Sequence, residues 1–313
     1  MKYCLRCNKE LKKAEAHYGQ HLSCFEEIFK VSGRIEFSSL IRKSSTSDNH
    51  NIGQEYQTSP HLTSYFGGNY RKYEAILGVS KYILKLSKPE YPELAPVEYV
   101  CNKIAYHCGL SVPIPFTLID YGEGELAFVS KNFMEKQHVH ATLNHLYHYK
   151  PLQDPQRYTV EDIAETIYRE TGSGADMDMY FRMLLFDALI GNHDRHGRNL
   201  ALIVTAKSQR LTPIYDNPSS LGLEFGSTLK ATFSPRGKIW TKDSHEPEMT
   251  EYLKEMDRIV VINKAQQFYN DISIDKIVEY IDESFSLSMQ MREALKKLIL
   301  KRYEDLGGYF ESR

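Results

Sequence analysis

Near residue 133 the chain passes from an alternation of strand and helix patterns to a mainly helical spacing of apolar residues, and this shift limits the fold more than any other sequence feature. The first part contains short β-rich runs, KYILKLS at 81–87 and TLIDYGEGELAFVS at 117–130. The second run is predicted to form a hairpin, because Gly122 to Gly124 mark a turn at its centre. Between the two runs, a helical pattern begins at Pro96 and stops before Gly109.

The later part of the chain follows the helical period. Apolar residues recur every three or four positions in 160–170 and 176–190, and the tail from about 249 to 310 fits three or four amphipathic helices. One more hairpin is predicted between these helices, with arms at 200–204 and 211–215. The patterns together predict an α+β fold, in which a β-rich amino-terminal lobe precedes a mostly helical carboxy-terminal lobe.

We expect three parts along the chain. Residues 1–30 carry a cysteine and histidine cluster, residues 31–133 form the β-rich lobe, and residues 134–313 form the helical lobe, with the crossover near 131–140. Residues 38–64 are rich in Ser, Thr, Asn and Gln and are predicted to be a long loop. A cleft between two lobes is the expected place for a ligand.

Composition excludes several classes of protein. The 313 residues carry 39 Lys plus Arg and 41 Asp plus Glu, so the net charge of −2 gives no global attraction to nucleic acid or anionic lipid. No run approaches the roughly 20 apolar residues of a membrane span, and the start lacks the apolar segment of a secretory signal. We expect a soluble cytoplasmic protein, and the sequence leaves open whether it acts in its own cell or in another.

The five cysteines are too few and too scattered for a disulfide scaffold. Cys101 and Cys108 lie within a helical apolar pattern and are predicted to be reduced core thiols. The other three form Cys4-x2-Cys7 and, thirteen residues later, His21-x2-Cys24, a spacing that can close a tetrahedron around Zn2+. The alternative is a coincidental cluster in which the cysteines pack as small hydrophobic residues.

A second constellation suits phosphoryl transfer. That reaction needs a carboxylate to orient the attacking hydroxyl, and oxygen ligands for Mg2+. Asn199 follows Asp194 by five residues, the offset of the catalytic base and metal ligand in protein kinases, and Asp216 follows after the predicted hairpin. Read singly, each of these residues fits a solvated polar turn or a helix cap better than a catalytic role.

A lysine near the end of a β-rich run completes this set. Lys85 could reach the α and β phosphates of ATP, and Glu98 on the next helix is the candidate carboxylate that fixes its direction. A lone strand lysine is more often a solvated edge charge. The ordered series of Lys85, Asp194, Asn199 and Asp216 favours the nucleotide-binding interpretation.

The chain resembles a known family, the HipA-like serine/threonine kinases, which are toxins of bacterial toxin–antitoxin operons. The resemblance rests on ILKLSKPEYPELAPVEY (83–99), LAFVSKNF (126–133), GNHDRHGRNL (191–200) and IYDNPSS (214–220). It implies a two-lobed, protein-kinase-like fold and a Mg·ATP-dependent transfer of phosphate to a protein hydroxyl. Such kinases modify components of translation, notably aminoacyl-tRNA synthetases.

The resemblance also implies roles for single residues. It makes Lys85 the ATP lysine, Asp194 the catalytic residue, and Asn199 and Asp216 the Mg2+ ligands. The adenine-side hinge would be formed by Ser130, Lys131, Asn132 and Phe133. The Cys4, Cys7, His21 and Cys24 cluster is not part of this kinase pattern.

Two departures from the family pattern carry further expectations. Lys85 comes early, as in the short HipT-type toxins, so the implied partners are a HipS-like small protein and a HipB-like helix-turn-helix antitoxin, which alone would contact DNA. The phosphate loop of relatives has its nearest match at 51–57, with Gly53 and Gln54 as ATP-binding candidates and no serine directly before the glycine. A plain flexible loop is the alternative there. The candidates for autophosphorylation are Ser44, Ser45, Thr46, Ser47, Thr58 and Ser59.

Two other functions share these residues. One is a catalytically weak, nucleotide-binding scaffold of a repressor complex, and the other is a small-molecule phosphotransferase. The complete catalytic set favours an enzyme over a scaffold. Protein and small-molecule acceptors are not distinguished, because surface loops make the contacts to the acceptor.

Overall fold

A computed structural model shows how these elements are arranged. It describes residues 2–43, 71–122, 124–135, 141–149, 158–197, 199–224 and 236–313. The chain divides into two units, which we call the sheet unit and the helical unit. The sheet unit contains Met1–Tyr99, Pro113–Gln137 and Phe285–Leu287, and the helical unit contains Val100–Val112, His138–Ser284 and Ser288–Arg313.

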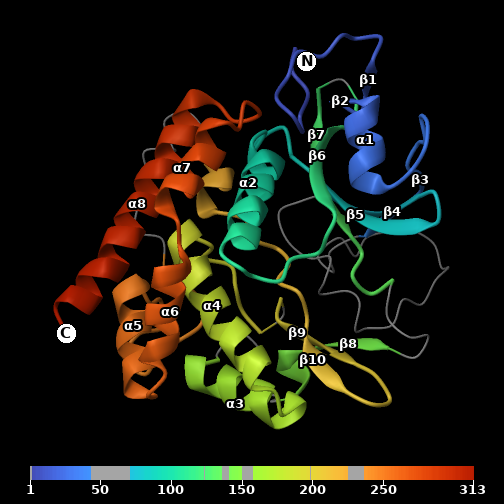
Figure 1. Cartoon of the computed structure of the whole chain (residues 1–313). Helices are drawn as coiled ribbons and strands as arrows, with labels where there is room; N and C mark the ends of the chain where they lie inside the picture. Colours follow the sequence, from blue (N-terminus) through green and yellow to red (C-terminus); the bar gives the residue numbers. More distant parts are fainter. Residues whose placement is uncertain are drawn as a thin grey trace. The chain divides into compact units, whose positions relative to one another are not determined.

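The sheet unit is built on a five-stranded antiparallel sheet with the order β3-β4-β5-β7-β6 (Figure 1). The strands are β3 Ser38–Lys43, β4 Arg71–Leu77, β5 Ser80–Leu86, β6 Phe116–Asp120 and β7 Leu126–Lys131. The predicted strand at 81–87 and the predicted hairpin at 117–130 are confirmed as β5 and as β6 with β7. Burial stabilises β5, because every side chain from Tyr82 to Leu86 is buried.

Alternate side chains of β5 reach opposite faces of the sheet. Leu84 and Leu86 belong to a core cluster with Phe25 and Phe29 of helix α1, Leu22–Phe29. Helix α1 follows the two-residue strands β1, Ala16–His17, and β2, Gln20–His21. Lys85 lies between the two leucines and therefore points to the other face.

Helix α2, Leu94–His107, begins two residues before the predicted start at Pro96. Proline is tolerated in the first turn because the amide groups there have no acceptor within the helix. Cys101 and Cys108 are confirmed as buried thiols that form no disulfide, and burial raises the pKa of Cys108 to about 12. The helix ends before Gly109, as predicted, and Gly109, two residues after its last residue, has a left-handed φ of 73°.

The prediction of a loop over 38–64 is wrong for its first residues, which form the edge strand β3. Backbone hydrogen bonds to β4 hold β3, with an irregularity in register between Ser38 and Ile41. An edge strand can be polar, so its sequence carries little apolar signal. The rest of the predicted loop lies outside the described residues.

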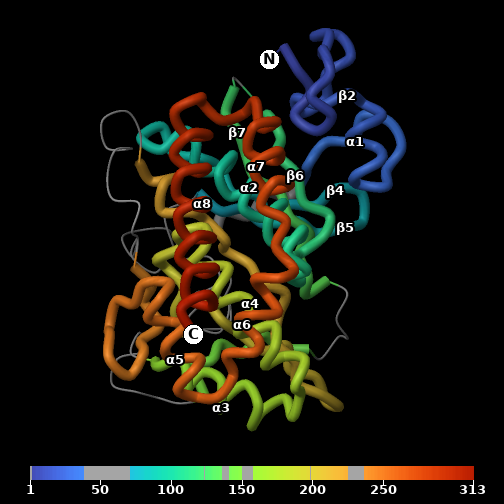
Figure 2. The backbone as a smooth tube through the Cα atoms, turned by 60° about the vertical axis from the view of Figure 1, so that its left-hand side comes forward, coloured from blue at the N-terminus to red at the C-terminus, as the bar shows by residue number. Residues whose placement is uncertain are grey.

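Helix α4, Gly174–Ile190, lies within the helical unit and packs against several of its other helices (Figure 1). Because neighbours cover it on most sides, α4 is buried over much of its length. Figure 2 shows the long helix α8 running beside α7. The other helices are α3 Val160–Thr171, α5 Met249–Arg258, α6 Ile262–Asp271, α7 Ile274–Asp282 and α8 Met289–Glu311.

The predicted helices and the second hairpin are confirmed, with two differences. The hairpin forms as β9, Ala201–Val204, and β10, Gln209–Leu211, so residues 212–215 leave the strand that was predicted for them. A third strand, β8, Thr142–His145, pairs with β9 and was not predicted. Short 3-10 turns occupy Leu146–His148 and Ser220–Leu223.

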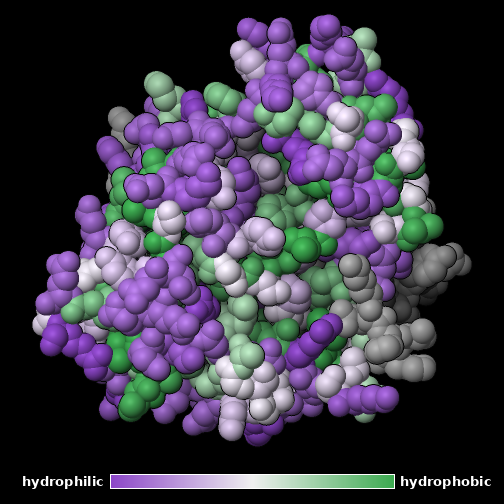
Figure 3. Space-filling view, viewed as in Figure 1, coloured by the Kyte–Doolittle hydropathy of each residue, from purple (hydrophilic) through white to green (hydrophobic). Residues whose placement is uncertain are grey.

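The surface of the tail helices is mostly polar. In Figure 3 the part over α5, α6 and α8 is largely hydrophilic, with few isolated apolar residues. This agrees with the predicted amphipathic pattern, whose apolar faces pack inward at residues such as Leu253, Phe268 and Leu298. Among the described residues, no helix has the length and apolar character needed to cross a membrane.

Candidate active site

The sheet unit contains a buried ion pair between Lys85 of β5 and Glu98 of α2. Their exposed fractions are 4% and 0%. The Lys85 Nζ atom also lies 5.7 Å from the centre of the Phe128 ring on β7. Buried charges are costly unless they are paired, so the carboxylate of Glu98 fixes the position of the ammonium group. The structure thus joins the two residues that the sequence proposed as partners.

Residues 130–133 lie at and just after the end of β7. Lys131 is paired with Glu135 and lies 5.0 Å above the Tyr82 ring, so its charge is held within the sheet unit. The backbone N–H of Asn132 donates to the carbonyl of Lys81 at 2.9 Å. These contacts fix this segment, the predicted hinge, against the start of β5.

The helical unit carries the candidate catalytic loop directly after α4. The helix ends at Gly191, whose φ of 69° lies in the left-handed region that glycine adopts without strain. The Asn192 side chain donates to Asp187 Oδ1 at 2.8 Å and to the carbonyl of Asp216 at 3.4 Å, and accepts from the N–H of Asp194 at 3.1 Å. Asn192 therefore links the loop to the segment that holds Asp216.

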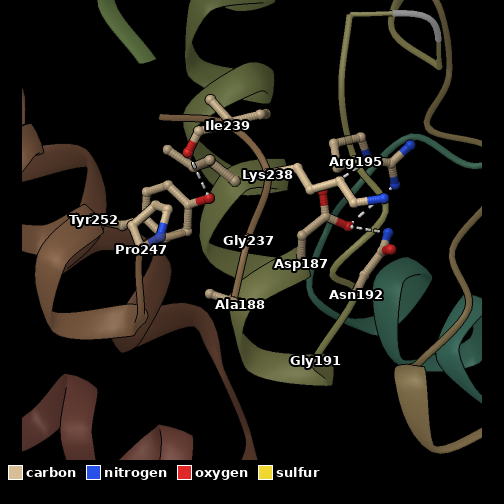
Figure 4. A pocket seen from close by; sticks show the side chains of 11 residues that line it. Asp187, Ala188, Gly191, Asn192, Arg195, Gly237, Lys238, Ile239, Pro247 and Tyr252 are labelled. Carbon is tan, nitrogen blue, oxygen red and sulfur yellow. Dashed lines mark hydrogen bonds and ion pairs between the residues drawn. The ribbon is translucent and has the colours of Figure 1, made fainter. Parts of the chain in front are cut away.

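A buried arginine, Arg195, bonds to both segments, and Figure 4 shows it beside Asp187 and Asn192. Arg195 is 2% exposed and donates to both carboxylate oxygens of Asp187, at 2.8 and 3.1 Å. It also donates to the carbonyl of Tyr215 at 2.7 Å and to Asn217 Oδ1 at 2.6 Å. Burial acts to lower the pKa of Arg195, but Asp187 outweighs it and the pKa is raised. The guanidinium is thus a permanent charge at the centre of the site.

Asp194, Asn199 and Asp216 are all in the segments that this arginine holds. Asn199 donates to the backbone carbonyl of Asp194 at 2.7 Å and accepts from the N–H of His196 at 2.8 Å. Asp216 has a φ of 54°, a left-handed conformation that is strained for a residue other than glycine. Its neighbours on both sides bond to Arg195, which explains how the strain is maintained.

Lys238 is a contact of Asp194 that the sequence did not suggest. Its Nζ atom lies 2.6 Å from Asp194 Oδ1, and the two side chains are 42% and 48% exposed. Gly237 permits this placement, because a Cβ atom there would lie 1.9 Å from the hydroxyl of Tyr252. That hydroxyl donates to the carbonyl of Ile239 at 2.9 Å, so both neighbours of Lys238 are fixed. Gly237, Lys238, Ile239 and Tyr252 line a cavity of about 10 Å³, which Figure 4 shows together with Asp187 and Arg195.

Among the described residues, the two histidines of the loop, His193 and His196, belong to no group of three or more close metal-ligand donors. Burial lowers the pKa of His193, which favours a neutral ring at neutral pH. His196 Nε2 lies 4.0 Å from Asp194 Oδ1, at the limit of an ion pair.

The four residues of the predicted zinc cluster also come together. The ligand atoms of Cys4, Cys7, His21 and Cys24 all lie within 4.8 Å of one another. Other predicted site residues lie outside the described part of the chain. These are Gly53 and Gln54 of the phosphate loop and the candidates Ser44, Ser45, Thr46, Ser47, Thr58 and Ser59.

Sequence reasoning missed several residues that shape the site. Asp187 could have been noticed as a lone carboxylate on the apolar side of a predicted helix. Asn192, Arg195 and Asn217 stand beside residues that were proposed, but their roles depend on tertiary contacts. Lys238 gives no signal in the sequence.

These features define a protein-kinase-like fold, in which a sheet carries a buried lysine–glutamate pair and a helical part carries an aspartate loop. The HipA-like C-terminal domain family matches residues 64–270. The chain belongs to this family. A protein of Haemophilus influenzae described as a putative kinase is 31% identical over 176 residues, and the match spans 51% of each chain.

Solved structures show the same fold. The proinflammatory kinase CtkA of Helicobacter pylori superposes with a TM-score of 0.65 at 18% identity, over 79% of this chain and 94% of that one. HipA of Shewanella oneidensis, solved with HipB and operator DNA, superposes with a TM-score of 0.59 at 16% identity, over 88% of this chain and 74% of that one. At these identities the likeness concerns the fold.

The Asp187–Arg195 pair gives a prediction about stability. Replacing Arg195 by Met should lower the free energy of unfolding of the helical unit by about 3–5 kcal/mol, because the Asp187 carboxylate would stay buried without its charge partner. Urea unfolding followed by the fluorescence of Trp240, the single tryptophan, reports on this unit.

Arg169→Met is the matched control, because its side chain is 56% exposed and its ion pair with Glu170 should contribute at most about 1 kcal/mol. Equal unfolding curves for the Arg195 and Arg169 variants would contradict the role assigned to the buried pair.

Proposed function

We propose that the chain is a Mg·ATP-dependent serine/threonine protein kinase. The observation that carries the proposal is the loop of Asp194 and Asn199, held together with the Asp216 segment by the buried Arg195. Membership of the HipA-like family and the buried Lys85–Glu98 pair support it. Phosphoryl transfer requires a placed carboxylate and a placed cation. The helical unit would supply the carboxylate of Asp194, and the sheet unit would supply the ammonium group of Lys85.

Asp194 would orient the hydroxyl of the acceptor and take its proton. Its side chain is 48% exposed, so an acceptor can reach it, while its backbone N–H is fixed by Asn192. A loop that is already rigid avoids an ordering cost when substrate binds, and this raises the effective concentration of the base.

Lys85 would bind the α and β phosphates of ATP. Its ammonium group has Glu98 as its charge partner, and the donors on the same nitrogen give further capacity for phosphate oxygens. The predicted hinge, Ser130 to Phe133, would bind the adenine side through its backbone, and Gly53 and Gln54 would belong to the loop over the phosphates.

Asn199 and Asp216 would hold Mg2+. Their donor set fits this ion, because an amide oxygen and a carboxylate are hard ligands and the amide oxygen of Asn199 has a second lone pair beside its bond to His196. When bound, Mg2+ neutralises charge on the triphosphate.

We further propose a role as the toxin of a HipBST-type system that acts in the bacterial cytoplasm on a translation component such as an aminoacyl-tRNA synthetase. HipA of Shewanella oneidensis was solved with HipB and operator DNA, which supports a HipB-like antitoxin as partner, alongside a HipS-like small protein. The net charge of −2 agrees with contact to DNA through the antitoxin alone. One of the serine and threonine candidates between 44 and 59 would be autophosphorylated.

The assignment of Asp194 predicts the result of a conservative substitution. Asp194→Asn should lower transfer of radiolabelled γ-phosphate from ATP to protein by about 10²- to 10⁴-fold, because the amide cannot accept the hydroxyl proton. The same variant should relieve growth arrest on expression. Asp243→Asn, at an exposed turn, is the matched control. Full transfer by the Asp194 variant would refute the mechanism.

Lys238 should assist this step. We expect Lys238→Met to lower kcat by about 10- to 100-fold and to change the KM for ATP much less, because a charge-assisted hydrogen bond to Asp194 is lost. Lys238→Arg should restore part of the rate. Initial rates over a range of ATP concentrations measure both constants, with the exposed Lys254→Met as control. An unchanged kcat in Lys238→Met would show that the contact is incidental.

A further inference from the structure

The proposed kinase chemistry uses none of the residues in the cluster of Cys4, Cys7, His21 and Cys24. Its donor atoms are close enough to share one metal ion. Cys7 Sγ lies 3.4 Å and Cys24 Sγ lies 3.9 Å from Nδ1 of His21, and all four donors fall within 4.8 Å of one another. A tetrahedral Zn2+ with Zn–S of about 2.3 Å and Zn–N of about 2.0 Å separates nitrogen and sulfur donors by about 3.5 Å. We propose that these residues bind a structural Zn2+ that attaches the amino-terminal segment to the edge of the kinase sheet.

The ring of His21 is prepared for a metal by a contact on its other side. Its Nε2 atom lies 2.9 Å from the backbone carbonyl of Glu10. A carbonyl only accepts, so Nε2 carries the proton and Nδ1 presents a lone pair to the sulfur atoms. Zinc-bound histidines commonly donate their second N–H to a carbonyl in this way. This contact is independent of the sulfur distances and indicates the same ligand atom.

The backbone places the two ligand pairs. The backbone N–H of Cys4 donates to the carbonyl of Lys9 at 2.9 Å, and the backbone carbonyl of Cys4 accepts from the N–H of Asn8 at 3.0 Å. These two bonds close a tight turn around Cys7. Asn8 has a φ of 59°, the left-handed conformation that asparagine tolerates best after glycine. His21 and Cys24 are three residues apart at the start of α1, and therefore lie on one face of the helix.

The donor set favours zinc in a structural role. Thiolates and an imidazole in a tetrahedral arrangement suit Zn2+, whereas the oxygen donors of the proposed Mg2+ site suit a hard ion. Four protein ligands also leave no open position for water or substrate, which a catalytic zinc site keeps. Cys4 is 1% exposed, so the site is partly shielded from solvent.

The segment between the ligand pairs covers the free edge of β6. The backbone carbonyl of Tyr18 accepts from the N–H of Asp120 at 3.0 Å. The fully buried side chain of Gln20 donates to Thr117 Oγ1 at 3.0 Å and to the carbonyl of Leu118 at 2.9 Å. Strand β6 is the last strand of its sheet, and uncovered edge strands are prone to pair with other chains. The metal would therefore stabilise the cover of this edge.

The cluster also reaches the surroundings of Lys85. Leu5, between the first two ligands, packs against the core cluster of Ala95, Leu118 and Phe128. The Phe128 ring lies beside Lys85 Nζ, and Ala95 belongs to the same helix as Glu98. Loss of the metal should therefore loosen the packing around the lysine–glutamate pair, a consequence that matters for catalysis only if the proposed function holds.

Metal analysis of the full chain tests the site. Protein purified under reducing conditions without chelators should contain about one Zn per chain, and Cys4→Ser/Cys7→Ser should lose it. Cys108→Ala is the matched control and should keep the metal, because this buried thiol lies in the segment after α2 and is not one of the four clustered donors. Wild-type protein that folds with no more zinc than the double variant would overturn the proposal.

Cobalt gives an answer that does not require any variant to fold. Wild-type protein stripped of metal and loaded with Co2+ should show the visible bands of a tetrahedral, sulfur-rich site, and removal of metal should lower the melting temperature. Absence of the bands would overturn the site, and an unchanged melting temperature would overturn its structural role. Neither readout involves phosphate transfer, so the zinc site and the kinase activity can fail separately.

Discussion

The candidate catalytic loop depends on the buried charge of Arg195. A guanidinium that is almost without water must place its N–H groups on protein acceptors, and here it finds the carboxylate of Asp187, the carbonyl of Tyr215 and the amide oxygen of Asn217. These acceptors come from the end of α4 and from the segment after β10. One side chain thus fixes two stretches of backbone that are distant in the sequence, and with them Asp194 and Asp216.

The sheet unit also contains a buried charge, and a single ion pair, Lys85 with Glu98, balances it. Lys85 points away from the leucines that flank it on β5, and Glu98 on α2 balances its charge in a buried place. In both units, packing fixes a charged group before any ligand arrives. Preorganised charges cost little to reorganise during reaction, which is the main contribution that a protein makes to phosphoryl transfer.

Sequence patterns predicted the parts of the structure that burial determines. The strand of Lys85, the hairpin after it and the helix that ends at Gly191 follow from apolar periodicity, because one face of each must leave water. Strands β3 and β8 were missed, since short strands at a sheet edge are held by backbone bonds that side chains do not reveal. The roles of Asp187 and Lys238 were missed for another reason. Each depends on a tertiary contact, and no spacing in the sequence encodes it.

The central claim of the proposed function is that Lys85 binds the phosphates of ATP and that Asn199 and Asp216 bind its Mg2+. A crystal structure of the chain with Mg2+ and a non-hydrolysable ATP analogue tests this most directly. We predict contact between the Lys85 ammonium group and the phosphates, with Asn199 and Asp216 coordinating the metal. A nucleotide bound elsewhere, or bound with Asp216 far from the metal, would contradict the account.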